Sequence, residues 1–249
     1  MLRAARRQGI PVKVMGGGTN VLVPDKGVEG IVIRTTGLAR EPEFVNGTTL
    51  LCRAGAGLSQ VVRLGILRGL QHVEALAGIP GTVGGAVAGN AGTRRGAIGD
   101  FVLMVRYVDF VGRVHEMRKE ELEFGYRHGP QIDGVITDVL LGFEKADPDT
   151  VRSRVVAFLT AREKTQPLWV LSAGCVFKNP GGAGAGQLIE AVELKGERAG
   201  GAMVSEKHAN YIINAGGANA SDVKALIEKI RKEVSEKKGV ALELELEIW

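Results

Sequence analysis

The sequence has few cysteines and few aromatic residues, and it has no long apolar run. Its 249 residues include two cysteines and four histidines, so neither a disulfide framework nor a four-ligand metal site is expected. No run approaches the roughly 18 apolar residues that a membrane helix needs. The N-terminal stretch lacks the apolar core of a signal peptide. These absences predict a cytoplasmic protein without a metal, a membrane partner or a disulfide.

Aromatic side chains make up only 5% of the chain, and the net charge is a modest +4. Nucleic-acid binders combine a stronger basic excess with aromatic residues that stack on bases. A basic nucleic-acid binder is therefore a distant alternative. The charge balance still permits a small anionic partner such as a nucleotide, and nothing in the composition predicts an oligomer, so we expect a monomer.

Glycine is abundant instead. The chain has 36 glycines, about 14% of its residues against a usual share of roughly 7%. More than half of them precede residue 100, without a collagen-like period. The remaining composition, 45% hydrophobic and 24% charged, is that of a globular protein. The length favours two modest domains.

Residue patterns predict a mixture of strands and helices. Short β-branched runs between turn residues predict strands at 11–15, 21–23, 30–34, 48–53, 103–110, 114–117, 134–143 and 211–213. Helical spacing of apolar residues predicts helices over 58–67, from Asp149 or Thr150 to Lys164, and from Ser221 or Asp222 to Gly239. Strict alternation predicts a last strand at 242–248. We therefore expect an α+β fold.

Two glycine-rich stretches are candidate ligand loops. Gly16-Gly17-Gly18-Thr19-Asn20 follows a predicted strand but fits neither a P-loop nor a Rossmann fingerprint. Alone, it is as readily a tight turn as a phosphate site. Residues 78–99 are too rich in glycine for a regular helix or strand, as if the backbone itself must approach a ligand. Together, the two stretches indicate a long, flat ligand with a diphosphate in its middle.

Three polar residues lie in positions that could carry chemistry. Cys175 follows a glycine in the run 172–180, SAGCVFKNP, although a lone cysteine is more often an inert small hydrophobe. Glu245 lies in the alternating C-terminal stretch between Glu243 and Glu247, for which a charged, exposed strand edge is a sufficient explanation. Arg127 ends the run FGYR.

Taken in order, these motifs resemble one family through nearly the whole chain. They are VMGGGTNVLV, EALAGIPGTVGGAVAGNAG, FGYR, SAGCVFKNP, LKGERAGGAMVSEKHANYIIN and GVALELELEI. The chain is similar to the UDP-N-acetylenolpyruvoylglucosamine reductases, and the short spacing after FKNP resembles their type II branch. The resemblance implies the FAD-binding fold of the vanillyl-alcohol oxidase type, in two subdomains, followed by an α/β substrate-binding domain. We expect the subdomains at 1–44 and 45–163 and the substrate domain at 164–239, with the C-terminal strand 240–249 joining the first subdomain.

The resemblance also implies a reaction. NADPH would reduce FAD, and the flavin would pass a hydride to the enolpyruvyl ether of UDP-N-acetylglucosamine to give UDP-N-acetylmuramate, a peptidoglycan precursor. The implied FAD contacts are Gly16, Gly17, Gly18, Thr19, Asn20, Gly78, Ile79, Gly81, Thr82, Gly84, Gly85 and Asn90.

The resemblance implies that three residues carry out catalysis. Arg127 would bind the substrate carboxylate in a fork, and Glu245, as the neutral acid, would polarise the enolate that forms. Cys175 would protonate it. Most family members have serine there, but a thiol, with an ordinary pKa of about 8.5, is a far stronger acid than an alkanol.

The resemblance further implies substrate contacts from Tyr126, Asn179, Lys164 and His208, and a structural histidine is an equally good explanation for His208. The rival hypothesis is a nucleotide-sugar binding module whose glycine loops hold a diphosphate without redox chemistry.

Overall fold

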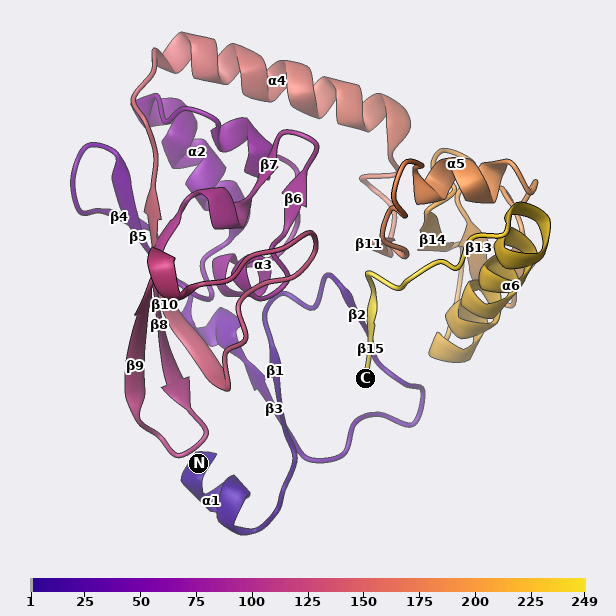
Figure 1. Cartoon of the computed structure of the whole chain (residues 1–249), viewed down its shortest axis with the longest axis horizontal. Helices are drawn as coiled ribbons and strands as arrows, with labels where there is room; N and C mark the ends of the chain where they lie inside the picture. Colours follow the sequence, from indigo (N-terminus) through magenta and orange to yellow (C-terminus); the bar gives the residue numbers. More distant parts are fainter. Residues whose placement is uncertain (1) are drawn as a thin grey trace. The chain divides into compact units, whose positions relative to one another are not determined.

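A computed structural model describes residues 2–249, which divide into two compact units (Figure 1). Unit 1 comprises residues 2–18 and 29–160, and unit 2 comprises residues 19–28 and 161–249. Within residues 2–249, no helix is both long enough and apolar enough to cross a membrane.

Unit 1 is built on an antiparallel sheet of five strands in the order β4-β5-β10-β8-β9. These strands are β4 (Glu43–Phe44), β5 (Thr49–Arg53), β8 (Val102–Asp109), β9 (Val114–Arg118) and β10 (Gly134–Gly142). The central strand β10 has no exposed residue and alternates only weakly between buried and half-buried ones; its buried Asp138 forms a salt bridge with Arg53. A separate parallel pair joins β1 (Val12–Met15) to β3 (Ile31–Arg34), and a small hairpin joins β6 (Gly92–Thr93) to β7 (Gly96–Ala97).

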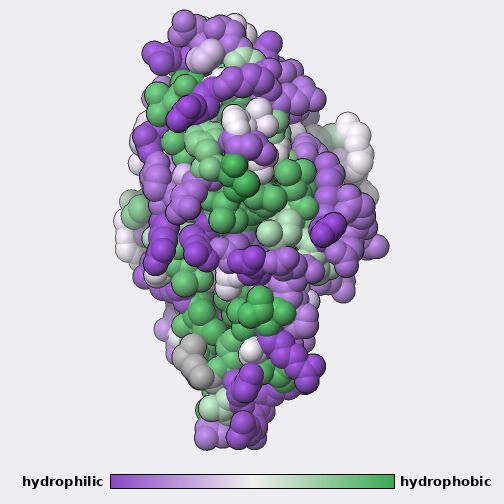
Figure 2. Space-filling model, turned by 90° about the vertical axis from the view of Figure 1, so that its left-hand side faces the viewer, coloured by the Kyte–Doolittle hydropathy of each residue, from purple (hydrophilic) through white to green (hydrophobic). Residues whose placement is uncertain are grey.

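The helices described in unit 1 are α1 (Leu2–Arg7), α2 (Leu58–Arg68), α3 (Val83–Ala88) and α4 (Pro148–Thr165), with short 3-10 turns η1 (Thr35–Leu38), η2 (Val73–Leu76), η3 (Ile98–Asp100) and η4 (Lys119–Glu121). Helices α2, α3 and α4 share one hydrophobic core with the sheet. The buried stripe of α4 consists of Val151, Val155 and Phe158. On the face of unit 1 that carries β4 and β9, apolar side chains gather in patches bordered by hydrophilic ones (Figure 2).

Unit 2 has a four-stranded sheet in the order β11-β14-β13-β12, with α5 and α6 packed beside it. The strands are β11 (Ser172–Cys175), β12 (Arg198–Ala199), β13 (Ala202–Val204) and β14 (Tyr211–Asn214), and the helices are α5 (Ala185–Glu190) and α6 (Ala220–Lys238). Helix α6 buries Leu226, Ile227, Ile230 and Val234, and Gly239 ends it at φ 67°. Its first turn is held by Asn219 and by Asp25, whose carboxylate accepts hydrogen bonds from the Ala220 and Ser221 amides.

The predicted C-terminal strand is wrong in its extent. Only β15 (Glu247–Ile248) forms a ladder, parallel to β2 (Val21–Leu22), and Leu244 adds a single bridge to Phe177. The alternation is nevertheless real, because Leu242 and Leu246 are buried while Glu243 and Glu247 are exposed. The alternating pattern therefore indicates an extended segment with one buried face, and this segment forms few hydrogen bonds to other strands.

Two further predictions need correction. Residues 83–88 do form a short helix, α3, despite their glycines, because Thr82 caps it and buried apolar neighbours pack around it. Helices α4 and α6 begin earlier than predicted, at Pro148 and Ala220. The cap of α4 is Asp147, whose Oδ2 accepts a hydrogen bond from the Thr150 amide at 2.8 Å.

Candidate functional site

The two glycine loops of unit 1 lie against each other. A Cβ on Gly16 would lie 2.5 Å from Thr82 Oγ1 and 3.5 Å from the Gly85 Cα. Thr82 Oγ1 in turn accepts a hydrogen bond from the Gly85 amide at 3.3 Å, as the N-cap of α3. The loop after β1 therefore approaches the start of α3 at a distance that only glycine allows.

Four further glycines of these loops are held in conformations or contacts that disfavour a side chain. Gly18, Gly78 and Gly81 have positive φ angles of 70°, 72° and 112°, which other residues rarely adopt. A Cβ on Gly84 would lie 2.7 Å from the Ala54 Cβ. Ile79, between Gly78 and Gly81, is partly buried against the core.

These loops fit the flavin dinucleotide that the sequence resemblance implies. A bound diphosphate needs main-chain N–H groups that a ligand can approach without Cβ atoms in the way, and Gly16, Gly17 and Gly18 are three successive residues without a Cβ. Thr19 and Asn20, also predicted as FAD contacts, fall in unit 2, where Asn20 Nδ2 donates a hydrogen bond to the Glu245 carbonyl at 2.9 Å.

Asn90 organises the loop that carries Arg127. Its side chain is buried, with Nδ2 donating to the Gly125 carbonyl at 2.7 Å and Oδ1 accepting from the Gly99 amide at 3.1 Å. Both ends of the carboxamide are thus committed to the protein. Asn90 was predicted as a cofactor contact, and the geometry gives it a structural task.

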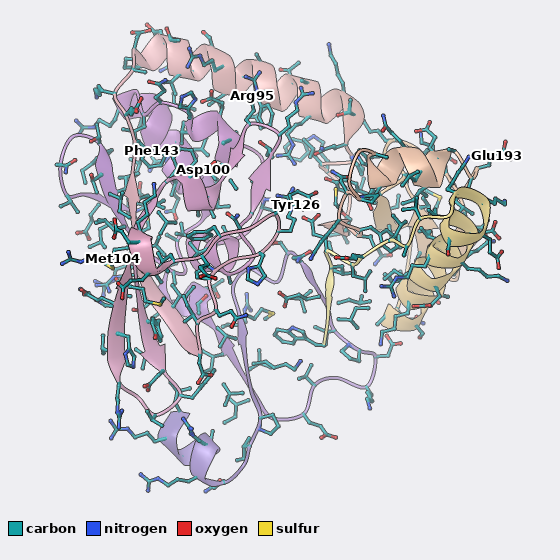
Figure 3. The ribbon with its side chains drawn as sticks, viewed as in Figure 1. Arg95, Asp100, Met104, Tyr126, Phe143 and Glu193 are labelled. Carbon is teal, nitrogen blue, oxygen red and sulfur yellow. The ribbon has the colours of Figure 1, made fainter. Side chains whose placement is uncertain are left out.

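Tyr126 and Arg127 form the tip of a tight turn. The Gly125 and His128 main chains pair on either side of it, and Arg127 takes a left-handed φ of 51°. A non-glycine residue in this conformation is strained, and such strain is common where a turn must present a side chain. The Arg127 guanidinium lies 5.3 Å from the centre of the Tyr126 ring. Tyr126 is 56% exposed at the loop tip (Figure 3).

In unit 2, Cys175 is the last residue of β11 and is half-buried. The chain beyond it is fixed by Asn210, whose Oδ1 accepts from the Phe177 amide at 3.0 Å and whose Nδ2 donates to the Phe177 carbonyl at 2.8 Å. Gly174, just before the thiol, has a φ of 80° at an irregularity in the ladder. The thiol thus follows a bulge and precedes a rigidly held segment.

Glu245 lies on the segment that is hydrogen-bonded to this one. Its amide donates to the Val176 carbonyl at 2.9 Å, and the Lys178 amide donates to the Glu243 carbonyl at 2.9 Å. Glu245 is half-buried, whereas Glu243 is exposed and 3.7 Å from the Lys178 ammonium. The structure therefore brings the segments of Cys175 and Glu245 together and distinguishes Glu245 from its neighbouring glutamates. Arg127 belongs to unit 1.

The three substrate contacts predicted in unit 2 have different surroundings. The Asn179 Oδ1 accepts from the Ala185 amide at 2.9 Å, and Lys164 is exposed on α4. His208 is half-buried, and burial lowers the pKa of its imidazole. Its Nδ1 accepts from the Asn210 amide at 3.2 Å, and Gly186 leaves room for its ring. These contacts fix the orientation of the His208 ring.

Tyr211, Gln166 and Arg162 were not predicted as site residues. Tyr211 is the strand partner of Cys175, its hydroxyl donates to Gln166 Oε1 at 3.3 Å, and Arg162 Nε donates to the same oxygen at 2.9 Å. The sequence carries no signal for this group, because strand pairing and the end of α4 bring it together.

Two known protein families match this chain, one in its N-terminal part and one in its C-terminal part. Residues 1–118 match the FAD binding domain family, and residues 166–249 match the C-terminal domain of UDP-N-acetylenolpyruvoylglucosamine reductase.

Individual relatives extend the similarity to the full chain. A UDP-N-acetylenolpyruvoylglucosamine reductase of Moorella thermoacetica is 44% identical over 249 residues, covering 100% of this chain and 82% of the relative. The enzyme of the same name from Heliobacterium modesticaldum is 40% identical over 251 residues, covering 100% and 80%. The crystal structure of UDP-N-acetylenolpyruvylglucosamine reductase from Thermus caldophilus superposes with a TM-score of 0.85 at 38% identity, covering 99% of this chain and 88% of that one.

Proposed function

Because the chain belongs to the UDP-N-acetylenolpyruvoylglucosamine reductase family, we propose how its own residues carry out that family's reaction. The observation that carries the assignment is the 44% identity over the whole chain. The protein is a flavoprotein oxidoreductase of peptidoglycan precursor synthesis that binds FAD and uses NADPH. A binding module without redox chemistry is set aside, since the C-terminal family match and the full-length relatives are reductases.

The glycine loops of unit 1 hold the cofactor in this proposal. FAD, when bound and reduced by NADPH, supplies a hydride to the vinyl carbon of the enolpyruvyl group. The main chain of Gly16–Gly18, together with Thr82 and Gly85 at the start of α3, would bind the diphosphate; the close Gly16–Thr82 approach supports this. Gly78, Ile79, Gly81 and Gly84 would line the same loop, and Thr19 and Asn20 would continue it.

Arg127 binds the carboxylate of the enolpyruvyl group. Its guanidinium offers two parallel N–H donors to a carboxylate, which a lysine could not match. The strained turn and the Asn90 hydrogen bond to Gly125 support a presenting role for this loop. Tyr126, largely exposed beside Arg127, would contact the substrate from the same tip.

Cys175 donates the proton that completes the reduction. As the hydride adds to the CH2 carbon, negative charge develops on the carbon next to the carboxylate and on its carboxylate oxygens. The thiol proton passes to that carbon, the sulfur becomes a thiolate, and solvent later returns the proton. Glu245 donates a hydrogen bond to the developing enolate, and its hydrogen-bonded position next to the Cys175 segment supports this role.

The sugar nucleotide would be held by polar side chains of unit 2. We propose Asn179 and Lys164 as contacts to the UDP portion, and His208 as a further contact on the side of α5. Consistent with the motif spacing, we assign the chain to the type II branch. We further propose FAD subdomains at 1–44 and 45–163, a substrate domain at 164–239, and a monomeric cytoplasmic enzyme.

The test is direct. Purified protein with FAD should lose its yellow flavin absorbance when NADPH is added without oxygen. The colour should return when the enolpyruvyl ether of UDP-N-acetylglucosamine is added, with one UDP-N-acetylmuramate formed per flavin. Reduction by NADPH without any product from the enolpyruvyl substrate would contradict the proposal.

A further inference from the structure

Tyr211 lies directly opposite the thiol of Cys175. The two residues are partners in the antiparallel pairing of β11 with β14, and directly opposed residues project their side chains from the same face of a sheet. The Cys175 side chain acts on the Tyr211 phenol, whose pKa it helps to raise.

The phenol is held on its other side by two residues at the end of α4. Gln166 Oε1 accepts a hydrogen bond from the Tyr211 hydroxyl at 3.3 Å and another from Arg162 Nε at 2.9 Å. The Gln166 amide also donates to the Arg162 carbonyl at 2.8 Å, which fixes the two side chains on one helical turn. The Tyr211 hydroxyl therefore has a fixed acceptor on one side and the thiol on the other.

Burial keeps this phenol protonated. Tyr211 is only 7% exposed, and burial, reinforced by the neighbouring Cys175, raises the pKa of the phenol above its ordinary value. A buried tyrosine hydroxyl needs a hydrogen-bond partner. At any pH where the enzyme works, Tyr211 can thus act as a donor.

We propose that Tyr211 is a positioning residue for Cys175, and that its hydroxyl donates a hydrogen bond to the thiolate that forms when Cys175 gives up its proton. The inference rests on the proposed role of Cys175 as proton donor. Arg162 and Gln166 act through Tyr211 by orienting its hydroxyl.

The hydrogen bonds can switch during the step without any atom being gained or lost. Before proton transfer, Tyr211 donates to Gln166 Oε1 and the thiol hydrogen faces the substrate. When the S–H bond breaks and the C–H bond forms, the hydroxyl hydrogen rotates from Gln166 to the new thiolate. Arg162 still satisfies the Gln166 oxygen, and the thiolate is reprotonated from solvent.

The pH dependence of thiol alkylation tests this contact in the FAD-loaded protein. Iodoacetamide reacts with thiolate, and Cys52 does not interfere, because it is fully buried and burial raises the pKa of its thiol to about 12. In Tyr211→Phe, we expect the midpoint of Cys175 alkylation to rise by about one pH unit, since a donor to the charged form is lost. Tyr107→Phe removes the same atom from β8 of unit 1 and should leave the midpoint unchanged.

The other groups around the thiol are the same in both proteins. Arg162 on α4, His208 before β14 and Glu245 on the C-terminal segment are the titratable neighbours of this pair. Burial moves the pKa of His208 downward, away from that of a thiol. A midpoint that is equal in wild type and Tyr211→Phe would overturn the proposal.

Kinetics separate this inference from the proposed function on which it rests. Tyr211→Phe should slow reoxidation of reduced flavin by the enolpyruvyl substrate about tenfold and leave reduction by NADPH unchanged. When it is added to Cys175→Ala, it should not slow reoxidation any further. An equal effect in Cys175→Ala would mean that Tyr211 does not act through the thiol. Normal turnover of Cys175→Ala alone would instead refute the donor role of Cys175, and the role of Tyr211 with it.

Discussion

At the scale of single residues, the main chain sets the positions of Cys175 and Glu245. The Glu245 amide is bound to the Val176 carbonyl, and the Asn210 carboxamide clamps Phe177 on both sides. These contacts use backbone atoms of the catalytic segments. Conservative substitutions of the two side chains should therefore alter chemistry with little effect on the fold.

Glu245→Gln tests the carboxyl group in this way. The variant should reduce FAD with NADPH at the normal rate and be reoxidised by the enolpyruvyl substrate about 100-fold more slowly, because a proton-donating acid is replaced by a weaker amide donor. Rapid-mixing absorbance of the flavin measures both rates. Glu243→Gln is the matched control, since Glu243 lies on the same face and is largely exposed. Equal damage to both half-reactions would indicate a structural role for Glu245.

The sequence offers candidate site residues where a motif carries them, and it gives no signal for residues that only the fold brings together. Cys175, Arg127 and Glu245 each stand in a recognisable run. Tyr211 reads as a strand residue, and nothing in its neighbours reveals that it faces Cys175. The family resemblance predicts Asn90 as a cofactor contact, but nothing in the sequence indicates its two hydrogen bonds to Gly125 and Gly99.

At the scale of elements, the first glycine loop packs closely against α3. Adding one methyl group to the loop, in Gly16→Ala, tests whether this close packing matters. Gly16→Ala would drive a Cβ against Thr82 Oγ1, which caps α3. We expect the free energy of unfolding to fall by about 1–2 kcal/mol through the lost cap and local overpacking, and FAD to bind more weakly.

Urea denaturation and FAD fluorescence titration measure the two effects. Gly47→Ala is the control, because a Cβ there meets nothing within 4 Å. If Gly16→Ala matched Gly47→Ala in both measurements, the close packing of this loop would have no role in stability or in FAD binding.

The β8–β9 hairpin supplies a prediction about pH. Burial alone would raise the pKa of Asp109, but hydrogen bonds from the Arg113 and Val111 amides and from His115 together lower it to about 2. A carboxyl whose pKa is lower in the folded state stabilises the fold at pH values above its unfolded pKa. This stabilisation should disappear as the pH falls from about 4 toward 2.

Thermal unfolding of Asp109→Asn between pH 5 and pH 2 measures that contribution. The variant should be less stable than wild type at pH 5, and the difference should shrink toward pH 2. Asp133→Asn, at an exposed aspartate before β10, should not show this convergence. A constant difference across the range would refute the assigned role of the Asp109 carboxylate.

Helices and strands with regularly spaced apolar residues were predictable from the sequence. Elements whose stability depends on contacts with distant residues were less predictable. Helices α2 and α6 and the central strand β10 follow their apolar spacing. Helix α3 was missed because its glycines have low helix propensity and its stability comes from packing against residues such as Ala54. The C-terminal alternation was overextended as a strand, because alternation reports one buried face and says nothing about hydrogen-bonded partners.

At the scale of the whole molecule, the proposed chemistry draws on both compact units. Gly16–Gly18, the second glycine loop and Arg127 belong to unit 1, while Thr19, Asn20, Cys175 and Glu245 belong to unit 2. Local sequence patterns could not assign residues 19–28 to unit 2, because that grouping depends on the pairing of β2 with the distant β15. The family resemblance, in contrast, predicted the order of the FAD-binding and C-terminal domains, and the family matches confirm it.

The central claim is that Cys175 gives the proton in the second half-reaction and takes no part in the first. Anaerobic stopped-flow absorbance of FAD in wild type, Cys175→Ala and Cys175→Ser tests it most directly. We predict that NADPH reduces all three at similar rates. The enolpyruvyl substrate should then reoxidise Cys175→Ala at least 100-fold more slowly than wild type and Cys175→Ser within about tenfold of it. Reoxidation of Cys175→Ala at the wild-type rate would contradict the account.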